Sequence, residues 1–539
     1  MEAWDIVVIG DGPAALRSAA VSAKNGGKTL LISSTALGNG GSIALDGLAA
    51  PIQEMNNKGH REDTIRSGYF LCDQDIVSAK TSMAIDEMNH LEKAGVVFSR
   101  DAKGLPLTKK GIGHTSPRVV DAGDASVRDV QQVLEEQCMK HGVVRRGDQL
   151  PIMLVTTKQK VDGIITLDMI NGRFLAIQAK AVIIADGGFE GIFNGTSIGF
   201  GMDLALRAGL PLRDMEFIGK TPFGVAETKL TLSSNILEYG ADLCDVSGNL
   251  ITADNLVQLC QAISETTGAV VDCRDMGDDK IWWQSAFRTV KDSTGVDMSK
   301  YTIGLENRVN QTFGGIATDE HGRAVIGSWS RWFTGLYAAG DAACSGLNGA
   351  GSLPGNRLLD ALTGGSSAGK HAAEWTTSQS FSNTKNLIQS LEECQAYFHE
   401  KFSDIPLDFV QRVGALDMKL LGIAKRFAAS ANDANELSKF IEELEDAETA
   451  AANLHLDQQS LIGNTNYASV LRINAGIRLL KASIRSSLAR NESRGVHQRS
   501  DFTETSAELI HHITVDSDDN VGILAVRKGQ KDNWILTPQ

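Results

Sequence analysis

The first 33 residues constrain the fold of this chain more than any other stretch of its sequence. Residues 5–9 form an apolar run typical of a buried strand, residues 28–33 form a second one, and a helix-like segment lies between them. Gly10 permits a tight turn, and Gly12 allows the backbone to approach a pyrophosphate at the helix N-terminus. Ala15 keeps the small side chain that helix–strand packing needs. This pattern predicts a βαβ unit that binds a dinucleotide; the alternative is a glycine-rich turn without a ligand.

The composition is that of a large, acidic globular protein. The chain has 539 residues, too many for one hydrophobic core, so we expect several domains. Its net charge of −14 argues against nucleic acid as a partner. The seven cysteines include no CxxC pair, so we expect no disulfide framework, zinc site or iron–sulfur cluster held by this chain, and a reducing, cytoplasmic location. We expect neither a signal peptide nor a membrane span, since no apolar run approaches about 20 residues.

Three segments of the sequence place glycines at the ends of apolar strands. The first ends at Gly10, residues 181–188 run into Gly187, and residues 335–341 run into Gly340. Such a sheet binds ligands at the carboxyl ends of its strands, so these ends belong to one domain. We therefore expect an α/β fold with a discontinuous Rossmann-like domain (residues 1–210 and 332–375), an inserted α+β domain (211–331), a C-terminal helical bundle (376–500) and a small β tail (501–539).

Further segments match a known family. They are residues 71–77 (LCDQDIV), 211–217 (PLRDMEF), 314–319 (GGIATD) and 492–499 (ESRGVHQR). Together with the glycine-rich strand ends, they resemble the flavoprotein subunit of the succinate dehydrogenase and fumarate reductase family over about residues 4–500. The resemblance implies bound FAD, an FAD-binding domain interrupted by a capping domain, and hydride transfer at flavin N5.

The resemblance also implies which residues hold FAD. They are Gly10, Gly12, Pro13, Ala14 and Ala15 at the pyrophosphate, Ser33 at the ribose, Gly40, Gly41 and Ser42 beside the isoalloxazine, Ala185, Asp186 and Gly187 on the adenine side, Asp341 at the ribityl chain, and Asn356 and Leu358 at the pyrimidine edge. Asp186 stands where the family usually has threonine, and Asp341 replaces a glutamate but keeps the carboxylate. Ser34 stands where covalent members carry the flavin on a histidine, so we expect non-covalent FAD.

The family moves a proton through an arginine of its capping domain. Residues 270–277 match the segment that carries this arginine, and Arg274 falls on its position. The resemblance therefore makes Arg274 the candidate catalytic residue. The alternative is a surface ion pair with Asp272 or Asp275.

Most side chains with which the family holds a dicarboxylate are absent. The matching substrate-pocket positions carry Thr221, Phe223, Asn310, Asn348 and Ser352. Ser352 replaces an arginine that clamps a carboxylate, and the loss of such a contact costs about 2–5 kcal/mol of binding. We therefore expect a substrate other than ordinary succinate or fumarate.

Arg357 is a cation at a position where the family has a serine near the flavin. We hypothesise that Arg357 lies near flavin N1/O2 and stabilises the reduced, anionic flavin. The alternative is that it points away and pairs with Asp360.

Four functions are compatible with this sequence. The first is an FAD-dependent oxidoreductase with a changed, less anionic substrate and Arg274 as the acid. The second is a flavin electron-transfer subunit, for which the family implies an iron–sulfur protein partner and peripheral membrane association through partner subunits. The third is an activity similar to adenylylsulfate reductase. The fourth is a flavin-free scaffold, against which Gly10 and Gly12 of the phosphate loop argue.

Overall fold

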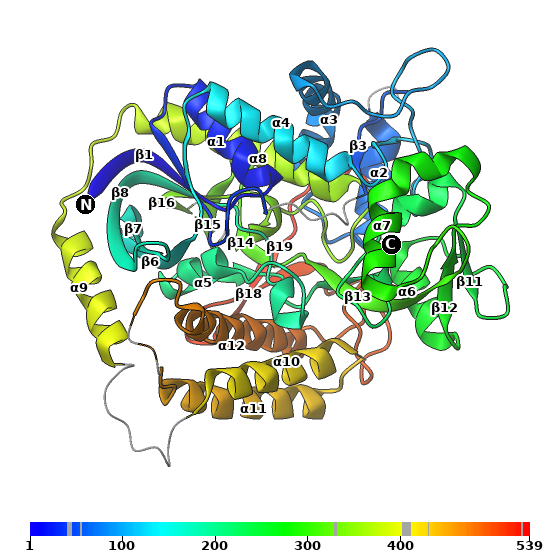
Figure 1. Cartoon of the computed structure of the whole chain (residues 1–539). Helices are drawn as coiled ribbons and strands as arrows, with labels where there is room; N and C mark the ends of the chain where they lie inside the picture. Colours follow the sequence, from blue (N-terminus) through cyan, green and yellow to red (C-terminus); the bar gives the residue numbers. More distant parts are fainter. Residues whose placement is uncertain are drawn as a thin grey trace.

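The computed structural model describes residues 1–39, 46–53, 57–327, 331–400, 411–429, 431–456, 458, 460–529 and 532–538. Figure 1 shows a large sheet with long helices above it, a smaller α/β unit at one side, and a layer of helices below. The predicted flavin-loop residues Gly40, Gly41 and Ser42 lie outside the described residues.

An eight-stranded sheet forms the core of the FAD-binding part. Strand β1 (Glu2–Ile9) pairs in parallel with β2 (Thr29–Ile32) on one side and with β8 (Arg173–Ile184) on the other. Helices cover both faces of this sheet, which is why β2 is apolar and buried along its whole length. The first half of β8 forms an antiparallel hairpin with β7 (Lys160–Asp168).

Three helices cover one face of this sheet: α1 (Pro13–Lys24), α4 (Ser126–Lys140) and α8 (Asn356–Thr376). Helices α1 and α8 touch through backbone, since a Cβ on Gly369 would lie 2.4 Å from the carbonyl oxygen of Ser18. Gly365 likewise packs on Ala14, so the middle of α8 runs along the first turns of α1. Both helix N-termini therefore face the same edge of the sheet.

The inserted unit, which we call the capping domain, has its own antiparallel sheet. Its strand order is β10 (Ile218–Val225), β13 (Ile303–Thr312), β12 (Ala269–Asp272) and β11 (Asp242–Asp245). Helices α6 (Leu256–Glu265) and α7 (Gln284–Thr294) complete it, at the right of Figure 1. A separate apolar core fills this unit, so it is a body distinct from the large sheet.

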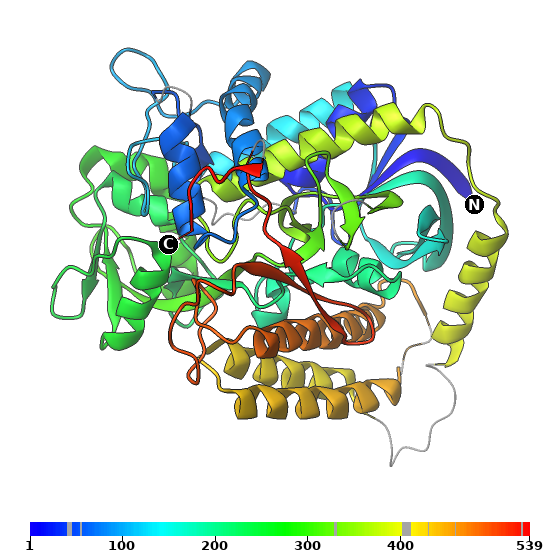
Figure 2. The same cartoon turned by 180° about the vertical axis from the view of Figure 1, so that it is seen from behind.

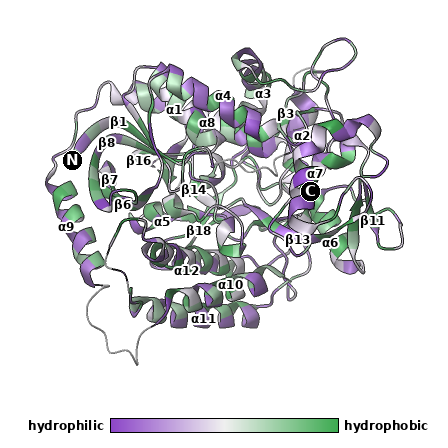
Figure 3. Ribbon diagram, in the orientation of Figure 1, coloured by the Kyte–Doolittle hydropathy of each residue, from purple (hydrophilic) through white to green (hydrophobic). Residues whose placement is uncertain are grey.

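Three helices of the predicted bundle pack together: α10 (Val413–Ala429), α11 (Ala434–Ala452) and α12 (Thr465–Ala489). Each has apolar and polar faces in Figure 3, as expected of helices with one face on a core. Helix α9 (Lys385–Glu400) instead packs mainly on β7 and β8, and it contacts α12 through the rings of Phe398 and Tyr467. In the described part of the chain, no helix is long and apolar enough to cross a membrane.

The C-terminal tail completes a sheet built from distant segments. Strands β18 (His511–Val515) and β19 (Val521–Ala525) extend β17 (Ala343–Cys344), β14 (Gly315–Ala317) and β9 (Leu212–Arg213). Figure 2 shows the tail, in red, crossing the middle of the molecule. The β tail predicted from sequence is therefore a structural bridge between both borders of the capping domain and the FAD-binding part.

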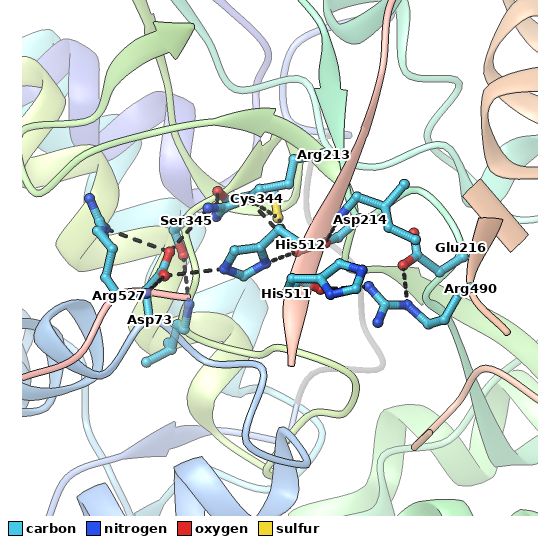
Figure 4. A network of polar contacts seen from close by, with 12 residues as sticks. Asp73, Arg213, Asp214, Glu216, Cys344, Ser345, Arg490, His511, His512 and Arg527 are labelled. Carbon is cyan, nitrogen blue, oxygen red and sulfur yellow. Dashed lines mark hydrogen bonds and ion pairs between the residues drawn. The ribbon is translucent and has the colours of Figure 1, made fainter. Parts of the chain in front are cut away.

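Buried charges connect the tail strand β18 to the strands that it bridges (Figure 4). The imidazole of His512 lies between two carboxylates, 2.7 Å from Asp214 and 3.2 Å from Asp73. Arg213 donates to Asp73 at 3.0 Å and to the thiol sulfur of Cys344 at 3.1 Å. These side chains are all buried, and they come from four separate segments of the chain.

The remaining elements are short or connect the main ones. They are β3 (Leu48–Ala49), α2 (Lys58–Ser67), α3 (Gln74–Ala94), β4 (Val119–Val120), β5 (Val144–Arg146), β6 (Gln149–Thr157), α5 (Phe200–Arg207), β15 (Arg323–Ile326) and β16 (Arg331–Ala338), with 3-10 turns at Glu190–Phe193, Ser234–Tyr239, Gly277–Trp283 and Gly340–Ala342.

Candidate functional site

A cleft of about 440 Å³ lies at the carboxyl ends of β1, β2, β8 and β16. It joins the three glycine-rich strand ends that the sequence separates by more than 300 residues. Predicted cofactor residues line it, namely Gly10, Gly12, Pro13, Ala14, Ser33, Ser34, Ala185, Asp186, Gly187, Asp341 and Arg357. We call it the cofactor cleft.

Glycines form the floor of the cofactor cleft because side chains would collide there. Gly10 has a φ of +125°, and a Cβ on it would lie 2.2 Å from the carbonyl oxygen of Ala185. Gly340 has a φ of +64°, and its Cβ would lie 2.7 Å from that of Ala14. Helix α1 begins directly after Gly12 and points its free N–H groups at this floor. The turn is therefore shaped for a phosphate-bearing ligand.

Among the described residues, three carboxylates that line the cofactor cleft each have a buried oxygen without a hydrogen-bond partner: Oδ1 of Asp11, Oδ1 of Asp186 and Oε2 of Glu190. The other oxygen of Asp186 accepts from the N–H of Gly201 at 2.8 Å, and burial raises the pKa of Asp186 to about 6. Unmatched buried acceptors fit hydroxyl or amino donors of a bound ligand. The residues present thus fit a dinucleotide such as FAD.

A second, smaller cavity of about 50 Å³ lies at the N-terminus of α8, under β10 of the capping domain. We call it the small cavity. It brings together three predicted substrate residues, Thr221, Asn310 and Ser352, and the predicted flavin-edge residue Leu358. Arg357 lines both the small cavity and the cofactor cleft, so the two spaces meet at its side chain.

Arg357 is held by acidic neighbours rather than by Asp360. Its Nε donates to Asp341 at 2.6 Å, and an Nη donates to the carbonyl of Asn310 at 2.9 Å. Glu190 lies 3.9 Å away, and burial raises the pKa of that carboxyl to about 7. The alternative partner named from sequence is wrong, because the Asp360 carboxylate is taken by Lys80 and by Ser345 at 3.0 Å.

Arg274 does not lie at either cavity. Its guanidinium forms an ion pair with Asp272 at 2.6 Å at the end of β12, and its side chain is 54% exposed. The structure thus matches the alternative to the predicted catalytic role, a surface ion pair. The surface position of Arg274 could not be predicted from the sequence, because the sequence after a strand does not determine the direction of the turn that follows.

Phe223 and Asn348 are also absent from the lining of the small cavity. Phe223 is fully buried in the apolar core of the capping domain, because the register of β10 shifts between Thr221 and Gly224. Such a shift breaks the strict alternation of faces along a strand. Asn348 lies in a turn whose backbone packs directly on Gly68.

Two predicted cofactor residues turn away from the cofactor cleft. The amide of Asn356 is buried between His60 at 2.8 Å and Thr64 at 2.9 Å on α2. Ala15 is fully buried, and its side chain belongs to the core under α1. Both residues position the helices that surround the cofactor cleft rather than line it.

The small cavity also contains side chains that the sequence argument missed. Tyr69 has a φ of +51°, and its carbonyl accepts from Arg494 at 2.9 Å, so the predicted motif of residues 492–499 holds a strained backbone at the site. Asp46 accepts from Ser233 at 2.7 Å. The signal for these residues was weak, because a lone tyrosine or aspartate in a loop has no periodic pattern.

Lys220 is a further residue that the sequence argument missed. It lies on β10 beside Thr221 and lines the small cavity. Burial lowers the pKa of its ammonium group. It therefore adds a second positively charged side chain to Arg357 in the lining of this cavity.

Comparison of the chain with known protein families agrees with a cofactor cleft that fits FAD. The family described as FAD binding domain matches residues 5–358, and the one described as fumarate reductase flavoprotein C-term matches residues 419–530. The fumarate reductase flavoprotein subunit of Mycobacterium tuberculosis is 28% identical over 97% of both chains. The corresponding subunit of Escherichia coli is 26% identical over 92% of this chain and 88% of its own.

Solved structures share the fold over the full chain. FrdA of Escherichia coli quinol fumarate reductase superposes with a TM-score of 0.89 and 22% identity, covering 100% of this chain and 99% of its own. Adenylylsulfate reductase of Archaeoglobus fulgidus has a TM-score of 0.79 and 15% identity, covering 99% and 97%. The family matches, with a cleft that fits FAD, identify the chain as an FAD-dependent oxidoreductase of the fumarate reductase and succinate dehydrogenase flavoprotein family.

Proposed function

We propose that this flavoprotein oxidises or reduces a substrate other than an ordinary C4 dicarboxylate, bound in the small cavity beside Arg357. One observation carries the proposal. Among the described residues that line this cavity, the cations are Arg357, which already pairs with Asp341, and Lys220, which has no carboxylate partner and is available to a substrate anion. A C4 dicarboxylate requires two such contacts.

When bound in the cofactor cleft, FAD would accept or donate the electron pair of this chemistry as a hydride. The protein orients the substrate, with Thr221 and Ser352 as hydrogen-bonding hydroxyls in the small cavity. Tyr69 is the candidate proton donor, since it lines the small cavity and a phenol carries its proton at neutral pH. This assignment replaces Arg274, whose ion pair with Asp272 lies at the surface.

The test is reoxidation of the reduced protein by a panel of acceptors. The flavin is reduced anaerobically with light, and its absorbance is followed after mixing with fumarate, with α,β-unsaturated monocarboxylates or with their amides. We expect slow reoxidation by fumarate and faster reoxidation by at least one other acceptor. Rapid reoxidation by fumarate alone would show that the small cavity still serves a dicarboxylate.

We infer that FAD is bound non-covalently. Ser34 lines the cofactor cleft at the position where covalent members of the family carry histidine, and its hydroxyl is not a comparable nucleophile. Acid precipitation should release all of the flavin into the supernatant. Flavin that stays with the precipitated protein would contradict the inference.

A second candidate function is electron transfer within a complex. We propose an iron–sulfur partner protein, because relatives in Mycobacterium tuberculosis and Rickettsia conorii are named as flavoprotein subunits. Association with a membrane would then come through such partners. Purification of the native complex, followed by iron analysis and electron paramagnetic resonance of the reduced sample, tests this; a chain that purifies alone and turns over its substrate would exclude an obligate partner.

A further inference from the structure

A third cavity, of about 400 Å³, lies between the capping domain and the helical layer. We call it the side chamber. Helix α6 and strand β10 form one wall, and helix α10 with residues 495–499 forms the other. Its apolar lining includes Ile218, Phe427 and Leu437. The function argued above does not use this space.

The side chamber adjoins the small cavity. The two share three lining residues, Lys220, Val257 and Val496. Lys220 therefore stands at the boundary between the cavity at the N-terminus of α8 and a much larger, mainly apolar space. A ligand held at Lys220 can reach both.

Lys220 lacks an acidic partner. In the described part of the chain, its ammonium group forms no ion pair or hydrogen bond, and burial lowers its pKa. Its backbone carbonyl accepts from the thiol of Cys260 at 3.6 Å, which fixes the backbone and leaves the ammonium group available. A half-buried cation that lines a cavity without an acidic neighbour is stabilised when an anion pairs with it, so this position is suited to an anionic ligand.

Among the described residues, the side chamber offers no comparable second cation. The guanidinium of Arg499 is taken by Asp501 at 2.7 Å. The buried carboxylate of Glu216 forms an ion pair with Arg490 at 2.6 Å, so the charge of Glu216 is balanced within the protein. The rest of a ligand held at Lys220 would therefore meet apolar walls and neutral polar groups, with the exposed carboxylate of Glu265 as a further anion in the lining.

We propose that Lys220 binds the single carboxylate of a monocarboxylate substrate whose apolar body lies in the side chamber. The proposal deepens the function argued above and rests on the small cavity being the reaction site. A ligand with one anionic group and an apolar remainder would not need the side chains with which the family holds a second carboxylate, and this explains their absence. Burial of that remainder supplies binding energy in place of a second ion pair.

Calorimetric titration of the oxidised, FAD-loaded protein tests the proposal without turnover. The probes are trans-2-hexenoate, its neutral amide trans-2-hexenamide, and fumarate. We expect hexenoate to bind at least tenfold more tightly than either of the others. Lys220→Met should weaken hexenoate at least tenfold and leave the amide unchanged, while the exposed control Lys229→Met changes neither.

A second variant tests the chamber independently of the charge. Ala429→Trp places a large side chain in the chamber from the exposed end of α10 and should weaken hexenoate, but not the shorter propenoate. Flavin content and thermal unfolding show that each variant folds. Equal affinity for acid and amide, or an unchanged hexenoate affinity in Lys220→Met, overturns the proposal. Hexenoate that binds as expected but never reoxidises the reduced flavin overturns the proposed reaction and leaves the binding site standing.

Discussion

Arg357 joins the two parts of the site. The chain places an arginine at the junction of the cofactor cleft and the small cavity, within 2.6 Å of Asp341 and 3.9 Å of Glu190. The Asp341 carboxylate also accepts from Gln311 at 3.1 Å, so both of its oxygens are occupied. The charge of Arg357 is thus partly offset by its neighbours.

Replacing Arg357 with glutamine removes the positive charge beside the flavin position and leaves Asp341 without its cation. Both changes disfavour an anionic reduced flavin, so we expect the midpoint potential of the flavin to fall. Spectroelectrochemical titration measures it. The control is Arg288→Gln, whose side chain is 86% exposed and lies on α7. An unchanged or higher potential in the Arg357 variant would refute the hypothesis that this residue stabilises the reduced flavin.

Substitutions of Tyr69 and of Arg274 should affect the rate of proton transfer differently. Tyr69→Phe removes the candidate proton donor and should slow acceptor-driven reoxidation by about 10²-fold or more. Arg274→Gln should leave the rate within about twofold, since its guanidinium is paired with Asp272 at the surface. Stopped-flow absorbance with the best acceptor of the panel measures both. The reverse order of effects would restore Arg274 to the role that the family resemblance implies.

The turn between β1 and α1 depends on glycine at one position in particular. Gly10 combines a left-handed backbone with a clash of 2.2 Å that any Cβ would make with Ala185. Gly26, just beyond α1, also has a positive φ of +90° but has no atom within 4 Å of a Cβ. Comparing the two glycines therefore distinguishes the effect of backbone strain, which both would show, from the effect of a steric clash, which only Gly10 would show.

Gly10→Ala should therefore lose FAD, whereas Gly26→Ala should keep it. In the first variant, β1 and β8 must separate or the turn must move, and either change opens the floor of the cofactor cleft. The second variant carries only the strain of the backbone conformation. The flavin-to-protein absorbance ratio after gel filtration measures the outcome, and circular dichroism confirms the fold. Full flavin content in Gly10→Ala would contradict this account of the turn.

The whole molecule is held together by the charge network of Figure 4 as well as by its cores. Burial alone would lower the pKa of His512, but the carboxylates of Asp214 and Asp73 raise it above its ordinary value. The pKa of each carboxyl is lowered in turn, although burial opposes this, because His512 and Arg213 stabilise the anions. The network thus favours a charged imidazolium between two carboxylates.

The contribution of His512 to stability should depend on pH with a defined sign. A raised pKa means that the stabilisation is complete below the ordinary histidine value of about 6.5 and declines as the pH rises through the raised value. His512→Gln should therefore cost about 3–5 kcal/mol of unfolding free energy at pH 6, and less at pH 9. Urea unfolding at both pH values measures this. A cost that grows with pH would mean that the imidazole is neutral in the folded protein.

The same network connects four segments of the chain, so His512→Gln should destabilise the other segments as well as the tail. We expect the tail strands β18 and β19 to become accessible to protease in His512→Gln at pH 6. A matched control is His321→Gln, because that side chain is 47% exposed and lies outside the network. Both measurements belong to the whole molecule, since no single element contains the network.

The βαβ opening and the three glycine-rich strand ends could be predicted from the sequence, because glycine geometry and strand periodicity act locally. The flavoprotein family followed from the resemblance of its motifs. The sequence also predicts weak binding of dicarboxylates, because side chains that would hold them are absent from the sequence, and this stays a prediction. The positions of Arg274, Phe223 and Lys220 became known only from the tertiary structure. The direction of the turn after β12 puts Arg274 at the surface. Register shifts in β10 put Phe223 in an apolar core and Lys220 beside the side chamber, and hydrophobic periodicity predicts neither the turn nor the shifts.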